Sequence, residues 1–389
     1  MTTVVLMGAG CGSKDSGGES SSGNVIKIAS VTPLSGSQAA MGESIKLGAQ
    51  MAFEEHKGEI EKLGFKLEFL PQDDQADPKV GVAVAQKLIA DKDVLAVMGH
   101  WNSGVAIPAS EVYVKDNLAM VSPANTAVEV TDRKLPNVNR ICARDDQQGP
   151  LGADYAVKEL GAKTVYVIHD KTTYGQGVAD EFQKKAAANG AKIAGFEGIT
   201  AGESDFSAVL NKVAAAKPDL VYFGGTYPEG SLILKQMREK GITAKFMGPD
   251  GMDSAEVIKI AGNAAIGAYF TSPAGNILLA PGGKEWIERF KAKWGKDPEN
   301  WALYGYDAMD VILEGLKQAI KANGGKKPSR LQVSQAIRSI QDFKVMSSTV
   351  SFDEKGDNKG AKLYVEQFKE AKYPATIIKE VNAGEYLKK

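Results

Sequence analysis

Short apolar runs alternate along this chain with longer stretches in which apolar residues recur every three or four positions. In the first third of the chain, the runs predict strands at 25–31, 65–71, 94–99 and 118–124. The intervening stretches 42–57 and 78–91 have the spacing of amphipathic helices. Strand, helix and strand in this order predict right-handed crossovers and a parallel sheet that is covered on both faces.

A second series of the same kind follows. Strands are predicted at 164–170, 192–199, 219–225, 245–250 and 266–273, and helices are predicted to begin near Gly175, Ser204 and Pro228. The tail differs, with helical patterns at 283–295, 301–322 and 329–340 and extended runs near 348–353 and 362–369. Two α/β series predict two lobes, and a tail too long for one lobe predicts that the chain crosses between them more than once.

Length and charge restrict the class of protein. A chain of 389 residues, 43% of them hydrophobic, is long enough for two cores. Its formal net charge of -1 gives no general attraction to nucleic acid, and no apolar run approaches the roughly 18 residues of a membrane span. The two cysteines and three histidines show no metal-ligand spacing and the chain has no P-loop, so neither a metal nor a cofactor is expected.

Residues 1–24 form a segment of a different kind. Small residues precede Cys11, and a Gly/Ser run then extends to Asn24, with too little apolar surface to pack. This order resembles the end of a bacterial lipoprotein signal, although Gly8 stands where that motif has leucine and no basic residue precedes Val4. We therefore expect an export signal and a flexible tether, with Cys11 as the candidate lipidation site.

The ends of the predicted strands carry the candidate site, because open parallel sheets bind ligands beyond their carboxyl edges. Ser103 lies at one such end, three residues after His100, which raises the question of a hydrolase site. The serine is outside any G-x-S-x-G motif, the separation is too short for His100 to turn back onto the hydroxyl, and no carboxylate orienter is obvious. No catalytic residue is therefore expected, and His100 is interpreted as a loop residue.

The same strand ends suit a bound amino acid. Ser103 begins a helix whose hydroxyl and free N–H groups can hold a carboxylate. The loop 122–126 adds the Ala124 carbonyl and the Thr126 hydroxyl, and Asp250 supplies one negative charge. Donors on one side and an acidic acceptor on the other match the zwitterionic head of an α-amino acid.

Ten ordered segments carry a resemblance to a known family: DDQADPK (73–79), GHWNSG (99–104), PAS (108–110), SPANTA (122–127), DQQGP (146–150), HDKTTYGQG (169–177), GITAGESDFS (198–207), YFGG (222–225), FMGPDG (246–251) and FDEKGDNKG (352–360). With them the chain, from Val25 to about Phe368, resembles the leucine/isoleucine/valine-binding protein family, the amino-acid receptors of bacterial ABC importers. The resemblance implies an α/β, type I periplasmic-binding-protein fold with two hinged Rossmann-like lobes, parallel sheets and no enzymatic activity.

The resemblance also implies an organisation and a location. Residues 25–145 and 274–347 would form lobe 1, residues 146–273 and 348–389 would form lobe 2, and residues 1–24 would lie outside both. The expected partners are a small-molecule amino acid and the membrane subunits of an ABC permease. The receptor is expected to be a monomer in the periplasm or another extracytoplasmic compartment, where Cys11 would carry a lipid anchor.

Site roles are implied residue by residue. Ser103 matches the serine that binds the ligand carboxylate, and Thr126 and Ala124 match the residues that hold the carboxylate and the ammonium group. Tyr174 matches an aromatic residue that closes the cleft from the second lobe. Asp250 falls where the branched-chain receptors have a glutamate that receives the ammonium group.

Several positions depart from the family pattern. Met41 stands in place of a tyrosine, Thr226 replaces another tyrosine, and Trp101 replaces a leucine of the side-chain pocket. The family disulfide is absent because its positions read Ala76 and Asn102, which leaves no unpaired thiol and does not argue against export. These changes keep amino-acid binding as the expectation and leave branched-chain specificity open.

The expected ligand is an uncharged aliphatic L-amino acid, a branched-chain one foremost, which the receptor delivers to the permease. The alternative keeps the fold and binds or senses another small solute, such as a short amide, a polyol or an aromatic acid. A third class, an enzyme of amino-acid metabolism, would need a nucleophile, metal or cofactor motif, and the sequence shows none.

Overall fold

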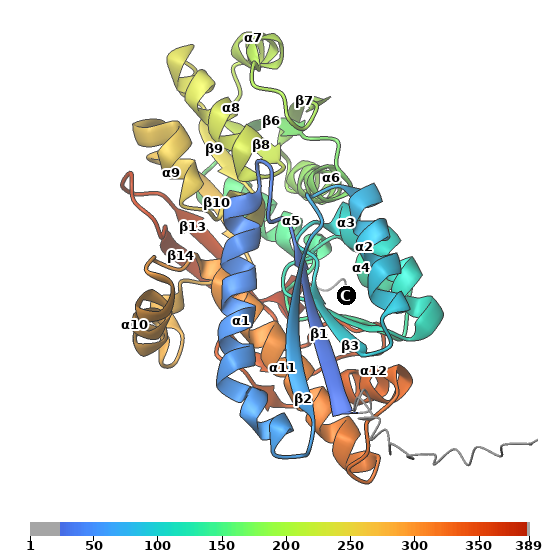
Figure 1. Cartoon of the computed structure of the whole chain (residues 1–389). Coiled ribbons are helices and arrows are strands. Elements are labelled where there is room, and N and C mark those ends of the chain that lie inside the picture. The colour runs from blue at the N-terminus through green and yellow to red at the C-terminus, as the bar shows by residue number, and fades with distance from the viewer. Residues whose placement is uncertain (1–23, 387–389) are drawn as a thin grey trace, which may run out of the picture.

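The computed structural model describes residues 24–386 and shows two α/β lobes (Figure 1). The first lobe is built on a parallel sheet in the order β2-β1-β3-β4-β5. Its strands are β1 (Val25–Thr32), β2 (Lys66–Asp73), β3 (Val94–Gly99), β4 (Ala119–Ser122) and β5 (Val138–Arg140). Its helices are α1 (Ala39–Glu61), α2 (Pro78–Ala90), α3 (Ser103–Tyr113), α4 (Glu129–Asp132), α10 (Gly283–Trp294), α11 (Asn300–Ala322) and α12 (Arg330–Arg338).

Both faces of this first sheet are covered. On β1, Ile26 and Ile28 point into the core that contains α1 and α11, whereas Ala29 and Val31 point into a separate core with α2 and α3. This alternation follows from the two-residue repeat of a strand. The long helices α1 and α11 run side by side in Figure 1, and a Cβ atom at Gly48 of α1 would clash with the α11 backbone. The small residue allows the two helices to approach closely.

The second lobe has a sheet in the order β14-β13-β10-β9-β8-β6-β7. Its strands are β6 (Thr164–His169), β7 (Lys192–Gly198), β8 (Leu220–Gly224), β9 (Lys245–Gly248), β10 (Tyr269–Ser272), β13 (Lys362–Gln367) and β14 (Thr376–Asn382). Its helices are α5 (Asp145–Asp154), α6 (Thr173–Ala188), α7 (Ser207–Ala216), α8 (Tyr227–Glu239) and α9 (Glu256–Ala261), and a short 3-10 turn spans Asp250–Met252. A small hairpin of β11 (Phe343–Lys344) and β12 (Thr349–Val350) forms a separate sheet.

The chain passes between the lobes three times, so the prediction of more than one crossing is confirmed. The crossings lie after β5, after β10 and between β12 and β13. The first and third are joined by Asp357, whose Oδ1 accepts from Arg140 Nε at 2.6 Å and whose Oδ2 accepts from Arg144 Nη1 at 2.8 Å. The two guanidinium groups hold the pKa of Asp357 below its usual range, although its burial acts in the opposite direction. Asp357 therefore links two of the three crossing segments directly.

The strands predicted between residues 25 and 273 are all present, within a few residues at each end. One detail of the prediction was wrong. The second sheet is not wholly parallel, because β13 runs antiparallel to β10, and β14 runs antiparallel to β13. The connection between β13 and β14 is short, as antiparallel neighbours allow. The extended run at 348–353 contains the two strand residues of β12 and the bridge residue Phe352.

Candidate functional site

The predicted site residues lie where the carboxyl ends of the two sheets meet. Ser103 is the first residue of α3 and follows β3, while Ala124 and Thr126 lie in the loop after β4. From the second lobe, Tyr174 lies in the first turn of α6 and Asp250 follows β9. All of these side chains are buried. The structure therefore gathers these five predicted residues at the interface between the lobes.

The first lobe presents hydrogen-bonding groups that its own fold leaves free. Ser103 Oγ accepts the Ala127 N–H at 3.2 Å, which leaves the hydroxyl hydrogen available. Thr126 Oγ1 is buried near the carboxyl group of Asp145, yet it has no hydrogen bond of normal geometry. The first N–H groups of α3 have no acceptor within the helix, as at any helix start. This side of the interface offers donors that suit a carboxylate.

The second lobe presents Asp250. Its Oδ1 accepts from Tyr174 Oη at 2.7 Å and from Gln148 Nε2 at 2.8 Å, and Tyr174 Oη accepts the Gly251 N–H at 2.8 Å. Burial raises the pKa of Asp250 to about 6, although these hydrogen bonds favour the charged form. The hydrogen bonds of the Asp250 carboxyl group thus come from Gln148 and Tyr174, outside the 3-10 turn that begins at Asp250. The Tyr174 hydroxyl therefore orients the Asp250 carboxyl group.

Asp145, at the start of α5, is an acidic residue that sequence reasoning missed. It is buried, and its Oδ2 has no hydrogen bond of normal geometry, although the Thr126 hydroxyl lies nearby. Burial raises its pKa well above the usual value, and the nearby charge of Asp250 acts in the same direction. The available signal was the polar run DDQQ directly after the last strand of the first series. The interface thus holds two acids where the sequence predicted one.

Gln38, also missed, connects the two lobes at the edge of this site. Its Oε1 accepts from Trp101 Nε1 at 3.2 Å and from Asn102 Nδ2 at 2.8 Å, and its Nε2 donates to Thr226 Oγ1 at 3.4 Å. The Trp101 ring packs edge-on against Trp301, with 5.1 Å between ring centroids. The structure therefore places Trp101 and Thr226 on opposite sides of the same interlobe contact.

Met41, the remaining predicted residue, is fully buried in α1. It belongs to a large hydrophobic core that includes residues of both lobes, and its backbone lies close to the Tyr227 hydroxyl from the second lobe. Its side chain is thus next to the interface, and a role in the ligand pocket stays a prediction.

The prediction that His100 lacks a carboxylate partner was wrong. His100 Nδ1 lies 2.8 Å from Asp74 Oδ2 and its Nε2 lies 3.2 Å from Tyr113 Oη, with all three residues fully buried. The carboxylate comes from the end of β2, two strands away in the sheet, so the spacing along the chain could not reveal it. No bond joins His100 to the Ser103 hydroxyl, and the arrangement fixes a loop rather than activating a nucleophile.

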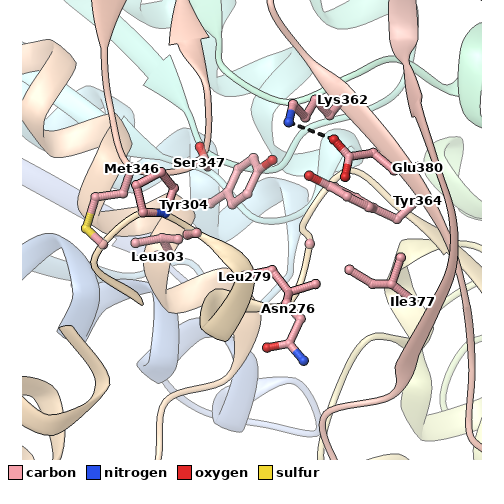
Figure 2. Close-up of a pocket in the computed structure, with 13 residues that line it drawn as sticks. Asn276, Leu279, Leu303, Tyr304, Met346, Ser347, Lys362, Tyr364, Ile377 and Glu380 are labelled. Carbon is pink, nitrogen blue, oxygen red and sulfur yellow. Dashed lines mark hydrogen bonds and ion pairs between the residues drawn. The ribbon is translucent and has the colours of Figure 1, made fainter. Parts of the chain in front are cut away.

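A separate cavity lies on the hinge side, between Tyr304 of α11 and Tyr364 of β13 (Figure 2). Its volume of about 90 Å³ is well below that of common ligand pockets, roughly 300–1,000 Å³. At its edge Lys362 and Glu380 already pair with each other at 2.7 Å. This cavity therefore offers no free charge to a zwitterion.

Between residues 24 and 386, no cluster of His, Cys, Asp and Glu side chains could hold a metal ion. Within the same range, none of the helices combines the length and the apolar character that a membrane span needs. The candidate lipidation site, Cys11, lies outside the described residues.

Comparison with known proteins identifies the family. The family described as periplasmic binding protein matches residues 25–372. Leu/Ile/Val-binding protein homolog 2 of Brucella abortus is 38% identical over 335 residues, which are 85% of this chain and 87% of the relative. The leucine-, isoleucine-, valine-, threonine- and alanine-binding protein of Pseudomonas aeruginosa is 37% identical over 337 residues, 86% of this chain and 88% of the relative.

Solved structures agree with this assignment. A leucine-binding protein from Thermotoga maritima superposes with a TM-score of 0.83 at 30% identity, covering 92% of this chain and 99% of its own. A branched-chain amino acid transporter substrate-binding protein from Streptococcus pneumoniae, in complex with isoleucine, gives 0.82 at 25% identity and covers 91% and 99%. A solute-binding protein from R. palustris in complex with benzoate shares the fold, with a TM-score of 0.80 at 22% identity and coverage of 92% and 96%. The chain therefore belongs to the periplasmic binding protein family, among the Leu/Ile/Val-binding protein homologues.

Proposed function

We propose that this chain is an extracytoplasmic receptor that captures an aliphatic L-amino acid between its lobes and delivers it to the membrane subunits of an ABC permease. Relatives named for leucine, isoleucine and valine binding support the ligand class. The similar solved structure in complex with isoleucine supports the same ligand class. The receptor acts by binding alone, without a catalytic group or a cofactor.

The observation that carries the proposal is a set of unpartnered polar groups where the lobes meet. Thr126 Oγ1 and Asp145 Oδ2 are buried close to each other with no hydrogen bond of normal geometry, in the interface to which α3 presents its N-terminus. Each such group costs about 1–3 kcal/mol when it stays unsatisfied. A zwitterion would satisfy both the donors and the acceptors. Its carboxylate would accept from Ser103 and Thr126, and its ammonium group would donate to Asp145 and Asp250.

An aromatic acid suits these groups less well. Benzoate has a carboxylate but no cationic group, so it would leave Asp145 and Asp250 facing an anion in a buried site. An amino acid brings a positive charge to the two acids. The pocket residues proposed for the ligand side chain, Trp101 and Met41, carry no charge, which favours an aliphatic side chain.

A binding screen tests the proposal. The protein is unfolded and refolded to remove any bound solute, and its Tm is then followed with each standard L-amino acid, acetamide, glycerol and benzoate. We expect the largest increases with leucine, isoleucine and valine, because ligand binding stabilises only the folded state. D-Leucine serves as the stereochemical control. A larger increase with benzoate, glycerol or a charged amino acid would overturn the proposal.

The remaining assignments are part of the same proposal. The lobes are taken as 25–145 with 274–347 and 146–273 with 348–389, joined by a hinge that closes on the ligand. The receptor is taken as a monomer that reaches its compartment through an export signal. A lipid on Cys11 would hold it at the membrane beside the permease.

A further inference from the structure

Gln148 of α5 fixes the two acids of the interface around one nitrogen atom. Its Nε2 donates to Asp145 Oδ1 at 3.2 Å and to Asp250 Oδ1 at 2.8 Å. Its Oε1 accepts the Asp250 N–H at 2.9 Å and the Thr271 hydroxyl at 3.2 Å. The amide is fully buried, and all four of its hydrogen-bonding positions are used. Gln148 therefore sets both the separation and the orientation of the two carboxyl groups.

The surroundings do not supply a free positive charge for this pair. Arg140 is the nearby cation, but its Nε donates to Asp357 Oδ1 at 2.6 Å. Its Nη1 donates to the carbonyl groups of Asn125 and Ala127, both at 2.8 Å. The other titratable groups that face the pair are Tyr174 of α6, Tyr222 of β8, Cys142 of the first crossing and Asp146 of α5. Asp146 is itself paired with Arg144. Two neighbouring negative charges would thus be buried without a counter-ion.

Ionising both of two neighbouring buried carboxyl groups is costly, which favours a state in which the pair keeps one proton. We propose that Asp145 and Asp250 hold one proton between them before the ligand enters, and that the ligand ammonium group displaces this proton to solvent. The inference rests on the proposed function and assigns Asp145 and Gln148 to the ammonium subsite. The ligand keeps its own three ammonium hydrogens, and only the carboxyl proton leaves. Gln148 is a positioning residue, because it acts through the two acids.

The direction of both pKa values agrees with the geometry. The pKa of Asp250 is raised to about 6 and that of Asp145 is raised well above its ordinary value, in each case chiefly by burial. Protons and the ligand ammonium group therefore compete for the same pair. We expect affinity to fall as pH falls, because protonated carboxyl groups are poorer acceptors for a cation.

Calorimetry with L-leucine measures the displaced proton. Binding is titrated at pH 7.5 in phosphate and in Tris, whose ionisation enthalpies differ. If one proton leaves, the observed heat differs between the buffers by about one ionisation enthalpy per leucine. Asp145→Asn should abolish this difference, because Asp250 alone is ionised at this pH. Gln148→Met should weaken leucine binding about tenfold or more and change the number of protons released, which a loss of packing alone would not do.

Gln318→Met is the matched control, because it also removes a glutamine-to-carboxylate bond, from Nε2 to Glu314 Oε1 at 2.8 Å on the exposed surface of α11. It should leave both heats unchanged. Leucine binding with equal heats in the two buffers would overturn the inference and leave the receptor function intact. A screen in which no amino acid binds would instead overturn the proposed function and the inference with it.

Discussion

The Tyr227 hydroxyl of the second lobe donates to the Ser37 carbonyl of the first lobe at 2.8 Å. Beside it, Gln38 Nε2 donates to Thr226 Oγ1 across the same boundary. Neither bond lies in a hinge crossing, so both depend on the lobes being together. Both contacts would be lost if the lobes moved apart, so we expect them to stabilise the conformation in which the lobes are together.

Tyr227→Phe should shorten the lifetime of the closed complex. Removing the Tyr227–Ser37 bond costs about 0.5–1.5 kcal/mol, which corresponds to a roughly two- to twelvefold faster ligand dissociation. Stopped-flow tryptophan fluorescence with leucine gives this rate. Tyr269→Phe in β10, where the Tyr269 ring packs against the Tyr155 ring, is the control and should leave the dissociation rate unchanged. Equal dissociation rates for wild type and Tyr227→Phe would show that the bond does not hold the lobes together.

The lobes should move toward each other when ligand binds. If leucine bridges Ser103 and Thr126 of one lobe to Asp250 of the other, it favours the form in which those residues are close. Small-angle X-ray scattering should then give a smaller radius of gyration with saturating leucine than without it. The same radius in both states, with leucine binding verified by calorimetry, would contradict a hinge-closing mechanism.

Asp250→Asn should weaken leucine binding at least about tenfold. The substitution removes a charged acceptor for the ammonium group, and charge-assisted hydrogen bonds contribute about 1.5–3 kcal/mol each. Calorimetry measures the change in Kd, and circular dichroism checks that the variant is folded. Asp205→Asn, at the exposed start of α7, is the control. A folded Asp250→Asn variant with wild-type affinity would remove Asp250 from the site.

Trp101→Leu should change which side chains the receptor accepts. The indole is held by Gln38 and by the edge of Trp301, so its loss opens space at the interface. We expect the affinity for phenylalanine relative to leucine to rise about tenfold, in line with the effect of hydrophobic pocket size. Competition binding gives the ratio, and Trp294→Leu in α10 is the control. An unchanged ratio would place Trp101 outside the side-chain pocket.

Buried acids should make the protein less stable at alkaline pH. Glu366 of β13 is fully buried, neither of its carboxyl oxygens has a partner, and burial followed by the charge of Asp253 raises its pKa well above 4.5. The pKa of Asp253 itself is raised to about 8, chiefly by burial. Because a raised pKa favours the protonated native state, this contribution is complete below the unfolded-state value and is lost as pH rises through the folded-state value.

We therefore expect the Tm of the wild type to fall between about pH 4 and pH 8, the ordinary and the raised pKa of Asp253, and Glu366→Gln to reduce that fall, because the amide stays neutral. Differential scanning fluorimetry across this range measures both. Glu380→Gln, at the partly exposed Lys362 pair, is the control and should follow the wild-type curve. Parallel curves for the wild type and Glu366→Gln would exclude Glu366 as the source of the pH dependence.

Sequence reasoning located the residues that directly follow regular strands. Ser103 and Asp250 were found in this way, because parallel strands bring their carboxyl ends to one edge. Asp145 and Gln38 were not, since their roles appear only when two lobes meet and no local pattern encodes that contact. The His100–Asp74 pair joins the ends of β3 and β2, which flank β1 in the sheet. Such strand order follows from three-dimensional packing rather than from spacing.

The interleaved tail has a consequence for how the protein is made. The core of the first lobe needs α11, which is synthesised only after most of the second lobe, and the second sheet needs β13 and β14 from the very end of the chain. Neither hydrophobic core can close while its last elements are still inside the ribosome. In a nascent chain of this topology, neither lobe can complete its folding until roughly the last quarter of the chain has been translated. Such a delay would suit the export that we propose, because a secretion channel passes chains that have not yet folded.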